Sequence, residues 1–64
     1  MSKVTAIHTA KIGPNRVRST VHFTRRDMLE DFARASRETS RNLPSKNLTV
    51  YEGEDCVILE RDLA

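Results

Sequence analysis

Few residues in this chain could do chemistry, and Cys56, His8 and His22 are the foremost candidates. The sequence holds one cysteine and two histidines. A thiol beside a histidine base is the minimum for nucleophilic catalysis, but nothing in the spacing places His22 next to Cys56. A lone cysteine in a strand is usually a small apolar filler. Glycine-rich phosphate loops and nucleophile elbows do not occur in the sequence. We therefore expect no enzymatic activity and no catalytic residue.

Metal and cofactor sites are also not expected. Two histidines and one cysteine cannot provide four ligands unless carboxylates join them. Acidic residues gather at Glu52, Glu54 and Asp55, but they lack the ordered oxygen-ligand spacing of a calcium loop. The single thiol cannot form an internal disulfide, and no apolar run approaches the roughly 18 residues of a bilayer span. These features favour a cytoplasmic protein without a signal peptide or a membrane partner.

Basic residues define two candidate binding surfaces. The net charge is +2, from eleven Lys and Arg against nine Asp and Glu, which permits an anionic partner without requiring one. The first surface is the exposed face of a predicted sheet, and its candidate partner-binding residues are Lys11, Arg16, Arg18, His22, Tyr51 and Ile58. The second is a basic stripe along a predicted helix, formed by Arg26, Arg34, Arg37 and Arg41. The alternative for this stripe is a solvated helix face with internal pairs, such as Glu30 with Arg34.

A predicted hairpin over residues 3–23 would position the first surface. Arg16, Arg18, Thr20 and His22 alternate with Val17, Ser19, Val21 and Phe23, which is the period of a half-buried strand. Pro14 and Asn15 suit the tip of the turn. Gly13 would then face Arg16, and the other expected pairs are Ile12–Val17, Ala10–Ser19, His8–Val21 and Ala6–Phe23. In this register Lys11 lies on the exposed face, while His8 points inward and Ile7 outward, which fits both residues poorly.

A helix is predicted over residues 25–41, with Thr24 as its N-cap. Its apolar stripe is Met28, Leu29, Phe32, Ala33 and Ser36. A second hairpin is predicted over residues 47–61, with Gly53 and Glu54 as a two-residue turn. One face of that hairpin carries Leu48, Val50, Val57 and Leu59, and the other carries Tyr51 and Ile58.

Both hairpins and the helix each offer one apolar side, which predicts an α+β fold. We expect a single domain over residues 1–64 in the order strand–strand–helix–strand–strand, with a four-stranded antiparallel sheet and the helix packed on one face. The strand order stays open. The expected function is a non-enzymatic protein-binding module, a small inhibitor or adaptor of the kind that phages and mobile elements encode. It would dock on a larger complex through its basic open sheet face, because interfaces combine an apolar centre with a polar rim.

Two other functions fit the same sequence. One is nucleic-acid binding through the same basic face, where cations would contact phosphates and aromatics would stack on bases. Tyr51 is the one aromatic expected there, and His22 is at best a second stacking residue, which makes the stacking platform sparse. The other is a structural homodimer, because a domain of this size buries only about 60% of its unfolded surface and gains stability by pairing.

Overall fold

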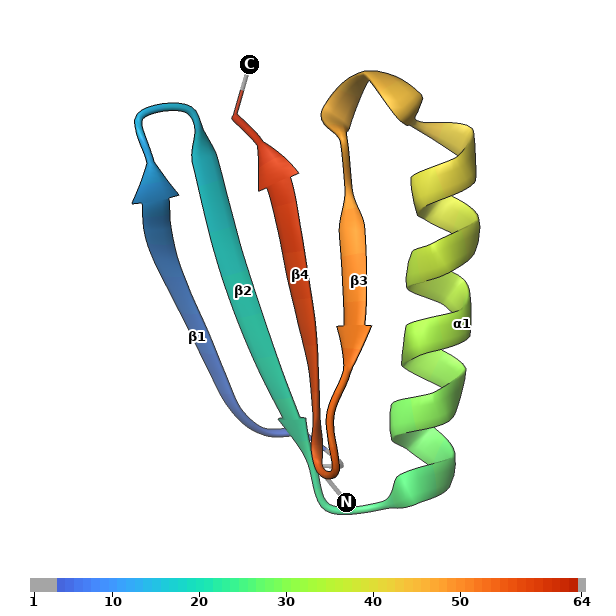
Figure 1. The fold of residues 1–64 in the computed structure, drawn as a ribbon. Helices are drawn as coiled ribbons and strands as arrows, with labels where there is room; N and C mark the ends of the chain where they lie inside the picture. The colour runs from blue at the N-terminus through green and yellow to red at the C-terminus, as the bar shows by residue number, and fades with distance from the viewer. Residues whose placement is uncertain (1–3, 64) are drawn as a thin grey trace.

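The chain forms a four-stranded antiparallel sheet with a long helix packed on one side, so the predicted α+β fold is confirmed (Figure 1). The computed structural model describes the backbone of residues 4–63 and the side chains of residues 6–63. The predicted hairpin start at Lys3 lies outside this range. The elements are β1 (Val4–Gly13), β2 (Arg16–Phe23), α1 (Arg26–Asn42), a 3₁₀ turn (Pro44–Lys46), β3 (Thr49–Glu52) and β4 (Cys56–Asp62).

The strand order, which the sequence left open, is β1-β2-β4-β3. The last strand therefore lies between β2 and β3 and pairs antiparallel with both. In Figure 1, α1 lies beside β3 at one side of the sheet, and β1 forms the opposite edge. The pairing of β2 with β4 brings residues far apart in the sequence into direct contact, from 34 positions in the pair His22–Cys56 to 46 in the pair Arg16–Asp62.

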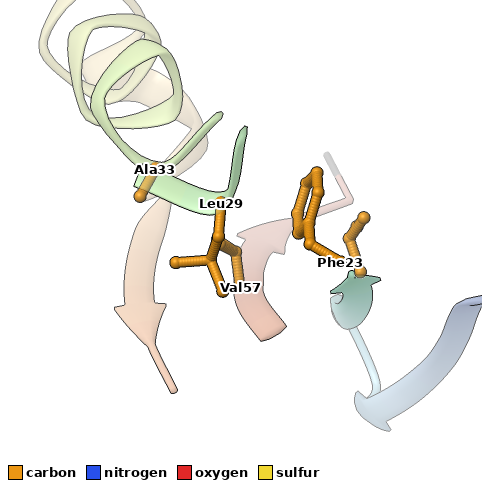
Figure 2. Packing of buried hydrophobic residues seen from close by; sticks show 5 residues of the cluster. Phe23, Leu29, Ala33 and Val57 are labelled. Atoms are coloured by element: carbon orange, nitrogen blue, oxygen red, sulfur yellow. The ribbon is translucent and has the colours of Figure 1, made fainter. Parts of the chain in front are cut away.

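The core lies between α1 and the inner strands. Leu29 on α1 and Val57 on β4 are 1% and 0% exposed, and Figure 2 shows their side chains meeting beneath the helix. The Phe23 and Phe32 rings pack with centroids 5.3 Å apart. The cluster consists of Val21, Phe23, Leu29, Ala33 and Val57, with Met28, Phe32, Val50 and Leu59 packed against it. The predicted helix stripe is thus confirmed, because its members supply the helical half of this core.

Both ends of α1 differ slightly from the prediction. The helix begins at Arg26, and its N-cap is Arg25 rather than Thr24. Instead of a side-chain cap bond, the Met28 amide donates to the Asp27 carboxylate at 3.0 Å. At the other end the helix extends to Asn42, one residue beyond the prediction, and the Leu43 amide donates to the Thr39 carbonyl at 2.9 Å.

Within residues 4–63, no helix combines the length and the apolar character that crossing a bilayer needs.

The register of β1 differs from the prediction by one residue. The turn at residues 14–15 and the pair Gly13–Arg16 are as expected, but Ile12 is an extra residue in a β-bulge. Beyond it the observed pairs are Lys11–Val17, Thr9–Ser19, Ile7–Val21 and Ala6–His22. A shift of one position moves every side chain of a strand to the other face. The bulge therefore corrects the two residues that fitted poorly, placing Ile7 on the helix side and His8 on the open side.

The second turn also differs from the prediction. The tip is formed by residues 54–55, because the Gly53 amide donates to the Cys56 carbonyl at 2.8 Å. A turn at Gly53 and Glu54 would pair Val50 with Val57 and Tyr51 with Cys56. The observed pairs are Val50–Leu59 and Tyr51–Ile58, so the register is shifted by two positions. An even shift keeps every side chain on its predicted face. Gly53 does not adopt a positive φ. A side chain at this position would instead crowd the thiol, since a Cβ built there would lie 2.9 Å from Cys56 Sγ.

Candidate functional site

The candidate site is the open face, defined as the side of the sheet opposite α1. The strand register determines which residues belong to this face, because residues paired directly across neighbouring strands share a face. Its members are Ala6, His8, Ala10, Arg16, Arg18, Thr20, His22, Thr49, Tyr51, Cys56, Ile58, Glu60 and Asp62. Of the six residues predicted for this surface, the structure places Arg16, Arg18, His22, Tyr51 and Ile58 together on it. Lys11 is the exception.

Lys11 lies on the helix side of the sheet, which corrects the predicted basic cluster at the first turn. The bulge at Ile12 pairs Lys11 with Val17, a buried residue of the helix side. Val17 pairs on its other side with Arg61 of β4. Lys11 and Arg61 therefore flank Val17 on one face, while Arg16 and Arg18 lie on the opposite one. A single unpaired residue thus divides the predicted cluster between two faces.

Arg16 and Arg18 are held by carboxylates of β4. The Arg16 guanidinium donates to Asp62 at 2.8 Å and to Thr49 Oγ1 at 3.2 Å, and it lies 3.9 Å from a Glu60 oxygen. Arg18 donates to Glu60 at 3.0 Å. Two cations and two carboxylates balance in this network, so this end of the open face is not a strongly basic surface. Sequence reasoning missed the network because it depends on β2 lying next to β4.

The Asp62 carboxylate also receives a hydrogen bond from the Asn47 side-chain amide at 2.7 Å. This bond, followed by the one from Arg16, lowers the pKa of Asp62 below its ordinary value of 3.8. Asn47 has a left-handed conformation with a φ of 50° at the end of the 3₁₀ turn, which asparagine tolerates better than most residues. The network therefore ties the connection between α1 and β3 to the end of β4.

The centre of the open face is less charged. One row crosses all four strands through the pairs His8–Thr20, Thr20–Ile58 and Ile58–Tyr51. Tyr51 is 49% exposed, and Ile58 is half-buried. Side chains this close on one sheet face form a continuous surface. Ile58 and Tyr51 thus form a small apolar and aromatic strip, and the network of paired charges lies at one end of the face beside it.

The other end of the open face gathers His22, Cys56 and Asp55. The Phe23 amide donates to the Asp55 carbonyl at 2.8 Å, so the next pair, His22–Cys56, is a non-hydrogen-bonded pair. In such pairs the Cα atoms are only about 4.5 Å apart and the side chains are close. His22 Nδ1 lies 3.9 Å from an Asp55 carboxylate oxygen. The His8 ring lies edge-on to His22, with centroids 6.0 Å apart.

The predicted basic stripe of α1 divides into residues with different contacts. Arg26 donates to the carbonyls of Gly53 and Glu54 at 3.2 and 2.9 Å and to the Glu52 carboxylate at 3.4 Å. Arg37 contacts the other Glu52 oxygen at 3.1 Å. These two arginines therefore fasten the helix to the β3–β4 hairpin.

The remaining arginines of the stripe face solvent. Arg34 pairs with Asp31 at 3.2 Å, whereas the sequence suggested Glu30 as its partner. Glu30 instead pairs with Arg26 at 3.2 Å. Arg41 makes no ion pair within residues 6–63. A continuous cationic stripe is thus not present on the described helix, and the alternative of a solvated face with internal pairs describes most of it.

A small hollow of about 160 Å³ lies between the start of α1 and the turn at residues 54–55. It is lined by Phe23, Thr24, Arg25, Arg26, Leu29, Glu54 and Asp55. Sites that enclose a small-molecule substrate usually measure about 300–1,000 Å³. The hollow is too small for that purpose, and the two arginines of its lining, Arg25 and Arg26, are engaged in ion pairs with their neighbours.

No protein-family model, curated protein sequence or solved structure matches this chain.

Proposed function

We propose that this protein is a non-enzymatic protein-binding module, a small inhibitor or adaptor, that docks on a larger complex through its open sheet face. The observation that carries the proposal is the strip formed by Tyr51 and Ile58 on a sheet face that α1 does not cover. A cytoplasmic location and a phage or mobile-element origin belong to the same proposal. They are supported by the single free thiol and the small domain.

The distribution of charge on the open face favours a protein partner. Aromatic residues are enriched at the centres of protein interfaces, and polar groups occupy the rim. Ile58 on the inner strand β4 occupies the centre here, Tyr51 lies beside it on the edge strand β3, and Arg18 with Glu60 lies to one side of both. Arginine held in place by a carboxylate loses less side-chain freedom when a partner binds, which lowers the cost of association. The face therefore has the make-up of an interface between proteins.

Nucleic-acid binding through the same face has less support. Affinity for nucleic acid comes mainly from cations that replace the counterions of phosphates. On the open face Arg16 and Arg18 already contact carboxylates, and Lys11 lies on the other side. A gel shift with single- and double-stranded DNA and RNA at low salt tests this alternative. A shift that weakens steeply with added salt would favour it over protein binding.

A homodimer is the other candidate, and it has an observation of its own. The β1 strand forms an edge of the sheet, and Ile7 on its helix side is 64% exposed. Unpaired edge strands readily pair with another chain. Sedimentation at several concentrations tests this function. An Ile7→Lys variant should then weaken self-association while leaving an open-face partner bound.

The experiment for the main proposal compares two isoleucines on opposite faces. Capture from a host lysate, with and without nuclease, identifies the partner, and its affinity is then measured with purified components. Tyr51→Ala and Ile58→Ser should each weaken binding by about 30-fold or more, the loss typical of a hot-spot residue. Ile7→Ser is the matched control and should leave the affinity unchanged. Equal affinity for the wild type and both open-face variants would contradict the proposal.

Arg18 is the suitable arginine for a companion test. Charge reversal at Arg16 would place a new carboxylate beside Asp62 and Glu60, so any lost binding could follow from lost stability. Arg18 is more exposed and contacts Glu60 alone among the described carboxylates. Arg18→Ala should weaken partner binding by a few-fold, as expected of a rim residue. Circular dichroism confirms that the variant is folded.

A further inference from the structure

We propose that His22, Asp55 and Cys56 form a Zn²⁺-binding site at the end of the open face. One ligand atom from each of the three residues lies within 4.8 Å of the other two. The set combines imidazole nitrogen, carboxylate oxygen and thiolate sulfur, all of which are ligands of Zn²⁺. This proposal goes beyond protein binding and does not depend on it.

The distances require little movement to accommodate a metal ion. Ligands about 2.0–2.3 Å from a tetrahedral Zn²⁺ lie roughly 3.3–3.8 Å from one another. His22 Nδ1 and the Asp55 oxygen are already 3.9 Å apart. The His22–Cys56 pairing is fixed by the β2–β4 ladder, and Asp55 directly precedes Cys56 in the tight turn. Two of the three ligands are thus positioned by the backbone rather than by flexible segments.

The surroundings of the site suit a bound cation. His22 pairs with Ala6 on β1 and with Cys56 on β4, so its direct neighbour on the β1 side carries only a methyl group, and the His8 ring lies edge-on at 6.0 Å. Gly53 lies against the thiol, where any larger residue would crowd it. Cys56 is half-buried, and Asp55 faces solvent, so the ion would have both an anchored side and an open side. The open side leaves a fourth coordination position for water.

The position of His22 beside Cys56 is what the sequence spacing does not show. Two histidines and one cysteine provide four ligands only if carboxylates join them, so the sequence alone predicts no metal site. The turn at residues 54–55 supplies Asp55, and the strand order brings β2 against β4. Zn²⁺ would bind the deprotonated thiol, and its proton would pass to solvent. The bound ion would join the β3–β4 turn to β2 and hold this end of the sheet together.

Cobalt provides the direct test, because Co²⁺ occupies zinc sites and reports its ligands in the absorption spectrum. Adding Co²⁺ to the purified chain should give one equivalent of binding, with a thiolate-to-cobalt charge-transfer band that ZnCl₂ abolishes. The band should be missing in Cys56→Ser. His22→Ala and Asp55→Asn should each weaken Zn²⁺ affinity by at least about tenfold, since even groups that only support ligands contribute about 10–100-fold.

Matched controls are available for two of the ligands. His8→Ala removes a neighbouring histidine that is outside the three-residue set, and Glu54→Gln neutralises the other acidic residue of the same turn. Both should keep the wild-type affinity. Loss of affinity in His8→Ala equal to that in His22→Ala would overturn the assignment. So would a missing charge-transfer band in the wild type, or unchanged Zn²⁺ affinity in Cys56→Ser.

A measurement on the unaltered chain keeps the test independent of any folding defect in the variants. Cys56 is the sole thiol of the sequence, so its alkylation by iodoacetamide reports on one atom. Zn²⁺ should slow this reaction at least about tenfold, and a chelator should restore it, because a metal-bound thiolate is a poorer nucleophile. An alkylation rate that Zn²⁺ leaves unchanged would refute the site.

Discussion

The two hairpins differ in how they are held to the rest of the molecule. Val50, Val57 and Leu59 of the β3–β4 hairpin lie under α1, and Arg26 fastens its turn to the helix through the carbonyls of Gly53 and Glu54. In the β1–β2 hairpin, β2 contributes Val21 and Phe23 to the core, but β1 lies at the far edge of the sheet (Figure 1). The outer strand depends on backbone pairing with β2 for most of its stability.

This difference shows that a small sheet need not be covered evenly by its helix. One helix of this length has too little surface to cover four strands, and it packs closest to the edge strand that follows it in the chain. The opposite edge keeps exposed apolar residues such as Ile7. Stability should therefore fall from the β3–β4 side of the sheet to the β1 edge.

The largest expected effect is at Leu29. Leu29→Ala should lower the free energy of unfolding by about 2–5 kcal/mol, because it opens a cavity at the centre of the core. The matched change on the exposed edge, Ile7→Ala, should cost less than about 0.5 kcal/mol. Urea denaturation followed by circular dichroism measures both. Similar losses in the two variants would mean that the sheet is covered evenly after all.

A moderate effect is expected at Gly53. Gly53→Ala should destabilise the protein by about 1 kcal/mol, because the new methyl group would crowd Cys56 Sγ. In a Cys56→Ala background the same change should instead stabilise by about 0.4–1 kcal/mol, since alanine restricts the unfolded chain. A double-mutant cycle from denaturation data detects the change of sign. Destabilisation in both backgrounds would point to backbone strain rather than contact with the thiol.

A similar or smaller loss is expected at Arg26. Arg26→Met keeps the apolar part of the side chain and removes its hydrogen bonds to Gly53 and Glu54. The cost should be about 1 kcal/mol, below the usual value for bonds to a charged donor because the side chain is exposed. Amide hydrogen exchange should quicken at the β3–β4 turn and remain unchanged in β1. Arg34→Met is the control, because the ion pair of Arg34 is with Asp31 of the same helix.

The smallest effect is on the acid sensitivity of the protein. The pKa of Asp62 is lowered by hydrogen bonds from Asn47 and Arg16, so its ionised form favours the folded state. This stabilisation is complete above the ordinary pKa of 3.8, declines as the pH falls below it, and disappears below the lowered folded value. Asp62→Asn should therefore lose less stability than the wild type between neutral pH and about pH 3.

The control for the acid experiment is Glu38→Gln, which alters an exposed helix residue that makes no ion pair within residues 6–63. Its denaturation midpoint should follow the wild type at every pH. If Asp62→Asn also follows the wild type, the hydrogen bonds to Asp62 do not persist in solution.

Alternation and helical spacing were enough to predict the elements and the fold class. The stripe from Met28 to Ser36, the first turn at Pro14 and Asn15, and the open-side position of Tyr51 and Ile58 all follow from local patterns. The bulge at Ile12 could not be predicted from alternation, because an extra residue leaves both halves of the strand pattern intact. The poor fit of Ile7 and His8 was its one visible sign.

The candidate site was less predictable because it depends on pairing between distant segments. Arg16 and Arg18 looked like free cations until β4 was placed beside β2, where Glu60 and Asp62 meet them. The same adjacency brings His22 to Cys56. Strand order reflects the packing of the whole chain rather than any short segment, so local sequence patterns carry no record of it.

The central position of β4 also affects how this domain forms during synthesis. A ribosome makes β1, β2, α1 and β3 first, and none of the strand pairs between the two hairpins can exist until residues 56–62 have emerged. The nascent chain holds only a lone hairpin and a helix before that point, and a two-stranded hairpin is marginal by itself. Assembly therefore waits for the last strand and should then occur in one cooperative step. A chain terminated before Cys56 would therefore not form a stable partial domain.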